Sequence, residues 1–410
     1  MRIRVSSINL QNVFAFILPT AIILSQWLSV AGISLSWVLY VFLFLLVFLR
    51  LDLFRQNPGF IVFGCVIVVV PIVTYPFGIS ADFQFGLYFS ILTGLATFFY
   101  ICFMDEKEYS AFIKGVLFSC MFFSVWGCYE IFTGNYLFFS NDAFFKKNWV
   151  GMNYPGVAFA NTNDLVQYLV LLFPISGYLL LKRSKWIFGA FTIIVVFVTY
   201  QAGSKLGMSS IIIIMLLASA ISTIIGKKVS QSINKLIIFA VSLLLFLWLL
   251  DIFTGVISSI FDNFLRVDTD SDYYTGRANI YIPLLRFIST HPLGGFGSSY
   301  SVTGFTPHNL ILFIFCDFGW LPGFVFVFVT IRMVIISWKK IKEQERKAFW
   351  CLMFACVCVF VLTSSISSCN EQRKAVWMFL GICVRNVYVK PFDCSEKFES
   401  RLVKFTLGGN

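Results

Sequence analysis

The strongest constraint in this sequence is a series of apolar runs, each close to the length that crosses a lipid bilayer. A helix of roughly 20 predominantly apolar residues spans a hydrocarbon core about 30 Å thick. Such runs occupy residues 10–30, 34–50, 58–77, 85–103, 111–133, 163–181, 186–202, 207–225, 234–253, 308–337, 348–368 and 374–390. The sequence therefore predicts an all-α polytopic integral membrane protein, with about twelve transmembrane helices in a single domain over residues 1–410. The run at 308–337 is longer than one span needs and is interrupted by Pro322-Gly323, which predicts a kink there.

The composition excludes a soluble protein and argues against several kinds of site. Charged residues make up only 12% of the chain and hydrophobic residues 59%, whereas soluble proteins are about 25% charged. Because so few charges cannot cover a surface in water, membrane lipids are expected to surround most of the chain. The 11 cysteines lie mostly inside apolar runs without metal-ligand spacing, and the net charge of +11 is dispersed between the runs. Neither a metal site, a cofactor nor a nucleic-acid partner is therefore predicted.

The basic residues determine the expected orientation of the helices. About three quarters of the 31 Lys and Arg residues fall on the side that holds both termini, and the bias recurs loop by loop. Cytoplasmic loops of membrane proteins carry such an excess. Both termini are therefore predicted to be cytoplasmic, which leaves two long segments on the outer side, at residues 134–162 and 254–307. Loops longer than about 12–15 residues in a compact protein are usually functional.

Polar residues near the predicted outer side mark a candidate site. Both histidines, His291 and His308, lie in or at the end of the larger outer loop. Ionisable groups this close to hydrocarbon are costly, and we expect those near helix ends to face a cavity or one another. The acidic residues of this kind are Glu130, Asp164, Asp251 and Asp317. The candidate site residues are His308, Arg277, Lys205, Arg286, Asn161, Asn163, Asp164 and Asn309.

The order of motifs around these residues resembles a known family. Arg277 precedes a His-Pro-Leu-Gly-Gly-Phe-Gly stretch at 291–297, a Pro-His-Asn sequence at 307–309 and an apolar helix broken at 319–323. Earlier, an Asn-Thr-Asn sequence at 161–163 opens one apolar run, and Gly-Ser-Lys at 203–205 joins two others. This arrangement, over residues 160–323, is similar to that of the bacterial O-antigen polymerase and O-antigen ligase superfamily. Lys205 stands where that family usually has Arg, and the glycine spacing after Asn309 favours the polymerase over the ligase.

The resemblance implies a GT-C-like, metal-independent glycosyltransferase with large periplasmic loops, in the bacterial inner membrane. Its donor would be an oligosaccharide on undecaprenyl diphosphate, and its reaction the joining of O-antigen or related repeat units at the periplasmic face. Arg277 and His308 would be central to catalysis: cations stabilise the departing diphosphate, and a histidine takes the hydroxyl proton or orients a substrate. A chain-length regulator is an implied partner. The residues implied to bind substrate are Lys205, Arg286, Asn161, Asn163, Asp164 and Asn309.

Simpler interpretations stay open for several of these residues. Asn309 could only cap a helix, Arg277 and Arg286 could anchor lipid headgroups, and the glycines at 294–297 could only shape a tight turn. His291 is expected to be a loop residue. Two other functions would suit the same substrate: an O-antigen ligase that transfers glycan to lipid A–core, and a flippase for the lipid-linked unit. A flippase is disfavoured because the middle of nearly every apolar run lacks charge.

Overall fold

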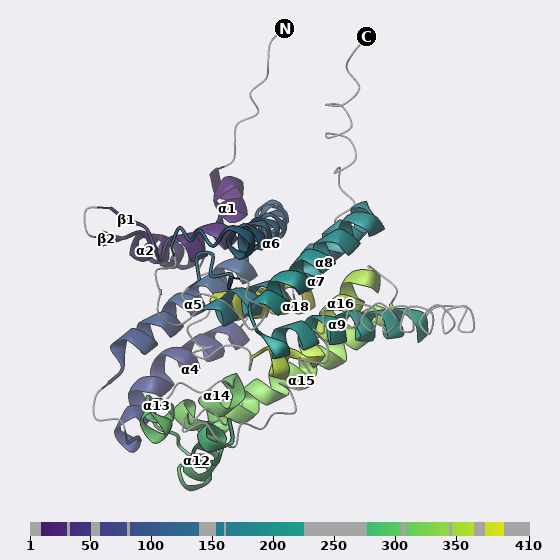
Figure 1. Cartoon of the computed structure of the whole chain (residues 1–410). Coiled ribbons are helices and arrows are strands. Elements are labelled where there is room, and N and C mark those ends of the chain that lie inside the picture. The colour runs from purple at the N-terminus through teal and green to yellow at the C-terminus, as the bar shows by residue number, and fades with distance from the viewer. Residues whose placement is uncertain are drawn as a thin grey trace, which may run out of the picture.

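Nearly all of the chain that the structure describes is α-helical. The computed structural model describes residues 10–30, 33–50, 58–79, 83–138, 153–159, 161–224, 277–304, 309–343, 347–364 and 374–388. Within these ranges, a two-residue antiparallel ladder joins the first two helices. The elements, drawn in Figure 1, are α1 (Leu10–Leu24), β1 (Ser29–Val30), β2 (Ile33–Ser34), α2 (Leu35–Phe48), α4 (Pro58–Thr74), η1 (Tyr75–Phe77), α5 (Phe85–Phe103), α6 (Glu106–Thr133), α7 (Thr162–Arg183), α8 (Lys185–Gln201), α9 (Lys205–Ile224), α12 (Arg277–Thr290), α13 (Ser298–Thr303), α14 (Leu310–Phe318), α15 (Trp320–Lys342), α16 (Lys347–Cys358), α17 (Phe360–Thr363) and α18 (Lys374–Tyr388).

Five helices are long and apolar enough to cross a membrane. Among the described residues they are Gly59–Phe77, Phe85–Phe103, Glu106–Thr133, Thr162–Arg183 and Trp320–Lys342, and six further apolar segments of 10–17 residues are helical. Every run predicted to span the membrane overlaps a helix, except 234–253, which lies outside the described residues. The all-α class is therefore confirmed, and these five helices are candidates to span a membrane. The number twelve and the GT-C-like arrangement stay predictions.

Helix α7 lies at the centre of the packing, because nearly all of its residues are buried. It packs against α6, α8, α9, α16 and α18. The Tyr168 hydroxyl lies 2.6 Å from Ser119 Oγ on α6 and donates to the Pro19 carbonyl on α1 at 3.2 Å. Gln167 Nε2 donates to the Thr363 carbonyl in α17 at 3.2 Å. In a bundle whose outer surface is apolar, such polar contacts help to fix which helix faces meet.

Two glycines let neighbouring helices approach closely. A Cβ at Gly115 of α6 would collide with the Phe16 carbonyl of α1, and a Cβ at Gly94 of α5 would collide with the Trp377 indole of α18. Small residues serve this purpose in membrane bundles because they let backbones meet. The pairing of α5 with α18 positions the candidate site, since the first residues of both helices line it.

The carboxyl end of α5 is held by two arginines. Arg50 donates to the Phe103 carbonyl at 2.8 Å and to the Glu108 carboxylate at 2.6 and 2.9 Å. Arg385 donates to the Cys102 carbonyl at 2.9 Å. Cations suit this end because a helix C-terminus carries unpaired carbonyls and partial negative charge. Both arginines belong to the side predicted to be cytoplasmic, so the amino end of α5 belongs to the predicted outer side.

The long run at 308–337 is not one helix. Helix α14 ends at Phe318 and α15 begins at Trp320, with Gly319 between them at φ +89°. Glycine adopts such a φ at no steric cost, so the break falls at this residue. The break therefore falls within the stretch 319–323 predicted from the sequence, but at Gly319 and not at Pro322-Gly323, because Pro322 lies in the first turn of α15, where its missing N–H is no loss.

Candidate functional site

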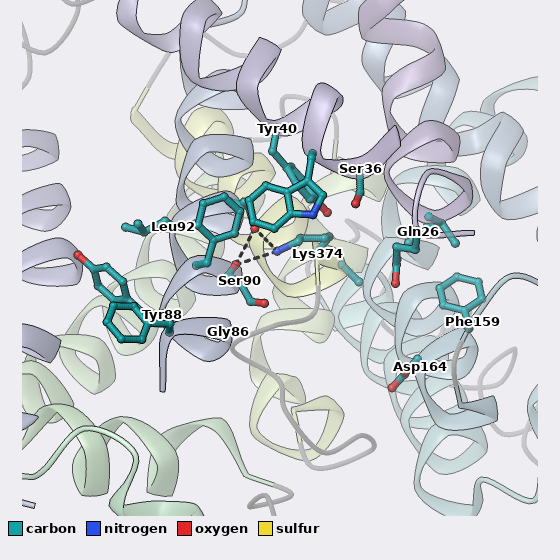
Figure 2. Close-up of a pocket in the computed structure, with 16 residues that line it drawn as sticks. Gln26, Ser36, Tyr40, Gly86, Tyr88, Ser90, Leu92, Phe159, Asp164 and Lys374 are labelled. Atoms are coloured by element: carbon teal, nitrogen blue, oxygen red, sulfur yellow. Dashed lines mark hydrogen bonds between the residues drawn. The ribbon is translucent and has the colours of Figure 1, made fainter. Parts of the chain in front are cut away.

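A cavity of about 690 Å³ lies between α1, α2, α5, α7 and α18 (Figure 2). Its lining comes from the carboxyl end of α1, the amino-terminal parts of α2, α5, α7 and α18, and the loop before α7. The charge pattern of the sequence predicts all of these helix ends on the outer side of the membrane. The cavity therefore lies where the sequence predicts a polar site, and its size is that of a small-molecule site.

Lys374 brings a buried cation to this cavity. It is the first residue of α18 and is 8% exposed. Its Nζ donates to the Ser90 carbonyl at 2.7 Å and to Thr93 Oγ1 at 2.5 Å, and it lies 5.1 Å from the centre of the Tyr40 ring. Figure 2 shows Lys374 reaching toward Ser90 in the middle of the cavity lining. An ammonium this buried is costly even with such contacts, which makes a functional role the first hypothesis to test.

Asp164 is the predicted site residue that lines the cavity. It is 5% exposed and enters the lining from α7 (Figure 2). Asn161 instead caps this helix, because its side chain accepts the Asn163 backbone N–H at 2.8 Å. Asn163 itself is half-buried on the first turn and is not part of the lining. The structure thus brings one of these three residues to the cavity.

Aromatic side chains form much of the cavity wall. The rings in the lining are Trp37, Tyr40, Phe85, Tyr88, Phe89 and Phe159. Trp37 and Phe89 lie 4.4 Å apart between ring centres. Tyr88 lies 6.1 Å from the ring of Phe296, which belongs to the predicted glycine motif. Ligand sites usually combine such apolar walls with a few polar groups that fix orientation.

The motif at residues 292–297, called the Gly-rich loop below, is bound to the break between α14 and α15. The Gly297 N–H donates to Asp317 Oδ2 at 3.0 Å, and the Ser299 N–H donates to Asp317 Oδ1 at 2.8 Å. Two backbone hydrogen bonds across the same break, of 2.9 and 3.0 Å, complete the attachment. Asp317 is fully buried, so its carboxylate serves to hold this loop.

The glycines of the Gly-rich loop are required by its shape. Gly294 and Gly297 have φ of +73° and +86°, a region that side chains disfavour. A Cβ at Gly295 would lie 2.8 Å from the Gly78 nitrogen, because the loop packs directly on the segment after η1. A tight turn therefore explains why glycines occupy these positions. The turn packs against the cavity wall through Phe296.

Glu130 of α6 holds the end of the smaller outer loop in a similar way. Its Oε2 accepts the N–H groups of Gly156 at 2.7 Å and Val157 at 2.6 Å, and the residue is fully buried. Val157 has φ +55°, which is costly for a β-branched residue and persists only when its surroundings hold it. Tyr136 donates to the Tyr154 carbonyl at 2.7 Å. Burial and the Glu130 carboxylate raise the pKa of Tyr136 to about 12, so this donor stays protonated.

The acidic residues near helix ends therefore have two different roles. The expectation that they face a cavity or one another is wrong for Glu130 and Asp317, which bind loop backbone. Asp164 does line a cavity. Asp251 lies outside the described residues. Of the three such acidic residues that the structure describes, two thus anchor loops and one lines the cavity.

Lys205 begins α9 beside the same smaller outer loop. The turn before it contains Gly203 at φ +68°, and a Cβ there would lie 3.3 Å from the Tyr154 ring. The loop at 153–159 therefore contacts the Lys205 turn at one end and lines the cavity at the other, through Phe159. The side chain of Lys205 lies outside what the structure describes.

The remaining predicted residues belong to α12 and α14. Arg277 begins α12, and Arg286 is exposed on this helix and does not line the cavity. Asn309 caps α14, because its side chain accepts two N–H groups of the first turn at 3.0 and 3.1 Å. His308 lies outside the described residues, as does the side chain of Arg277. The capping interpretation of Asn309 is confirmed.

His291 is occupied by contacts to its own helix. Its ring stacks on Phe287 with 4.0 Å between ring centres. Its Nδ1 lies 2.8 Å from Thr290 Oγ1 and 3.1 Å from the Phe287 carbonyl. This histidine therefore has a local structural role at the end of α12, in agreement with its prediction as a loop residue.

Lys374 is one of the few basic residues on the predicted outer side, and no motif in the sequence marks it as part of a site. The available signal is its position: it is the first residue of an apolar run and not part of the loop before it. A basic residue that begins an apolar run becomes buried when the run forms a helix and packs against other helices. The aromatic wall has no comparable signal, because 19% of the whole chain is aromatic.

The fold and the cavity define a class, an all-helical protein with several helices long and apolar enough to cross a membrane and a ligand-sized cavity at one end of its helices. Comparison of the chain with protein-family models, curated protein sequences and solved structures finds no match. In the part of the chain that the structure describes, no three His, Cys, Asp or Glu side chains are grouped to hold a metal ion. The function is therefore inferred from the residues of the site.

Proposed function

We propose that this chain is a polymerase of O-antigen or a related surface polysaccharide, which joins repeat units carried on undecaprenyl diphosphate. The observation that carries the proposal is the cavity at the predicted outer helix ends, with Lys374 and Asp164 in an aromatic wall. The substrate combines sugar hydroxyls, a diphosphate and a lipid. A cation, a carboxylate and apolar rings beside the membrane are the groups that such a molecule requires.

The proposed reaction is a glycosyl transfer between two lipid-linked chains. A hydroxyl oxygen of the acceptor sugar attacks the anomeric carbon of the donor, forming a new C–O bond. The bond from that carbon to the diphosphate oxygen breaks, and undecaprenyl diphosphate leaves with the electron pair. The hydroxyl proton passes to a base, and cations stabilise the leaving group. We assign the base or orienting role to His308 and the cationic role to Arg277, supported by Lys205 and Arg286.

The number of membrane spans and the sides of the membrane on which the termini and loops lie are part of the same proposal. About twelve spans in a GT-C-like fold would place both termini in the cytoplasm and the segments 134–162 and 254–307 in the periplasm. The donor's own sugar–diphosphate bond supplies the energy, so neither a metal nor a cofactor is required. Because Asn161 and Asn309 cap helices, we assign the first substrate contact in this region to Asp164. A chain-length regulator is a proposed partner.

Replacing His308 with alanine is expected to abolish the polymer while leaving the protein in the membrane, because the acceptor loses its base or its orientation. The measurement is a gel of surface lipopolysaccharide from a strain that lacks the gene and carries the intact gene or the variant. The expected pattern is core with a single repeat unit, with the ladder restored by the intact gene alone. His291→Ala is the matched control, since the ring of the other histidine contacts residues of its own helix end, and it should restore the ladder. A normal ladder with His308→Ala would remove His308 from the mechanism.

The deletion strain separates the alternative functions. Bare core with polymer still built on its lipid carrier would make the chain an O-antigen ligase. Bare core with single units retained on the cytoplasmic face would make it a flippase, and the outer-face site would then be wrong. Core with one repeat unit supports the polymerase.

A further inference from the structure

We infer that the cavity between α1, α2, α5, α7 and α18 binds the sugar–diphosphate head of a polyprenyl-linked glycan, with Lys374 contacting a phosphate oxygen. The glycan part of this ligand rests on the proposed function. The anionic part rests on the cavity itself, from three observations: a buried cation, the helix ends around it and the aromatic wall.

The charge of the cavity wall favours an anion beside α5. Lys374 Nζ is held against this helix by Ser90 and Thr93 at 2.7 and 2.5 Å. Helix α5 begins at Phe85 in the same wall, and its N-cap residue Gln84 makes no side-chain hydrogen bond to the first turn. Uncapped amides and the partial positive charge of a helix N-terminus attract anions. The Lys374 ammonium, held further along the same helix, adds a compact point charge of the kind that often binds phosphate.

The opposite side of the cavity suits a sugar. Asp164 enters from α7, and Gln26 and Ser36 enter from the ends of α1 and α2 (Figure 2). A carboxylate accepts hydrogen bonds from hydroxyls, and an amide both donates and accepts them. The aromatic rings of the lining provide apolar surface for a sugar face or the first isoprene units. A volume of about 690 Å³ accommodates a head of this size.

Lys374 could instead have a purely structural role, in which its replacement would weaken helix packing and not ligand binding directly. Its contacts to Ser90 and Thr93 join α18 to α5, so removing it could simply loosen two helices. Gly86 allows a test that leaves those contacts intact. It lines the cavity as the second residue of α5, and a Cβ there would meet nothing within 4 Å. Gly86→Leu therefore takes up cavity space without displacing any neighbour.

The experiment measures binding of undecaprenyl diphosphate, with undecaprenol as the neutral comparison, by native mass spectrometry of the purified full chain in detergent. Lys374→Met should lower the affinity for undecaprenyl diphosphate at least about tenfold and leave undecaprenol unchanged. Lys374→Arg should stay within a few-fold of the intact protein. Lys182→Met is the matched control, because Lys182 also lies over a tyrosine ring, at 5.6 Å from that of Tyr178, but is exposed on the predicted cytoplasmic side. It should bind normally.

Gly86→Leu should also weaken binding at least about tenfold while the thermal unfolding midpoint stays that of the intact protein. Its control is Gly59→Leu, the second residue of α4, where a Cβ likewise meets nothing within 4 Å. Gly59→Leu should bind normally. If Lys374→Met fails to fold, the affinity of Gly86→Leu alone decides whether the cavity binds undecaprenyl diphosphate. Intact affinity in Gly86→Leu, or equal loss of undecaprenol and undecaprenyl diphosphate in Lys374→Met, would overturn the inference.

The lipopolysaccharide gel keeps this inference distinct from the proposed function. Binding that depends on Lys374 and Gly86, in a chain whose deletion leaves the ladder normal, would support the site and refute the polymerase. A deletion that leaves single repeat units, rescued by a Lys374→Met variant that binds normally, would support the polymerase and refute the site.

Discussion

Replacing Asp317 with asparagine is expected to release the Gly-rich loop from α14. The two N–H groups of Gly297 and Ser299 are bound by different oxygens of Asp317, at 3.0 and 2.8 Å. Asparagine has the same shape but a single acceptor oxygen, so one buried N–H would face the amide nitrogen. Leaving such a group unpaired costs about 1–3 kcal/mol. Hydrogen–deuterium exchange of peptides covering residues 292–299 should therefore become faster, and the polymer ladder should shorten.

Asp105→Asn is the matched control for this prediction. Asp105 caps α6, and its Oδ1 alone accepts the N–H groups of Lys107 and Glu108, each at 2.8 Å. An asparagine can supply that one oxygen and is an equally good N-cap. Exchange near residues 105–108 should therefore stay slow. Unchanged exchange in the Gly-rich loop of Asp317→Asn would show that the carboxylate does not hold it.

Replacing Glu130 with alanine is expected to free the loop before α7. Gly156 and Val157 would lose their common acceptor, and Val157 would no longer be held at its φ of +55°. Two buried N–H groups left unpaired cost about 2–6 kcal/mol together. Because Phe159 and Asp164 follow this loop into the cavity, the expected result is faster exchange at 153–159 and a loss of polymer.

Replacing Glu130 with glutamine removes the negative charge of the side chain but keeps an oxygen that can accept hydrogen bonds. Both N–H groups bind the same oxygen, Oε2, at 2.6 and 2.7 Å, so a glutamine oxygen can accept both. Glu130→Gln should therefore keep most of the protection that Glu130→Ala loses. Equal loss in the two variants would mean that the charge, and not the acceptor position, stabilises the loop.

The helices could be predicted from the sequence because each apolar run has a clear chemical boundary. The run at 85–103 coincides with α5, since Gln84 precedes it and Asp105 starts the next helix with a capping box. The break in the run at 308–337 could be placed only to within residues 319–323. Its position at Gly319 depends on the Gly-rich loop that packs there, and a proline in a first turn resembles a helix breaker when only the sequence is read.

The candidate site could be predicted only in part. Asp164 could be found because an acidic residue at the outer end of an apolar run is unusual. Asn161 and Asn309 were harder to assign, because the same residue type caps helices and binds sugars. Glu130 and Lys374 have roles that arise from distant partners, the loop at 156–157 and the amino end of α5. Such pairings depend on tertiary packing and leave no pattern in local sequence.

The central claim is that this chain joins lipid-linked repeat units, and the most direct test is the reaction itself. The purified protein would be placed in liposomes with undecaprenyl-diphosphate-linked single repeat units from the strain that encodes it, and the products followed by mass spectrometry. The proposal predicts lipid-linked chains of two and more units together with free undecaprenyl diphosphate, in the absence of metal and nucleotide. Repeat units that stay single, in liposomes where the same protein binds undecaprenyl diphosphate, would contradict it.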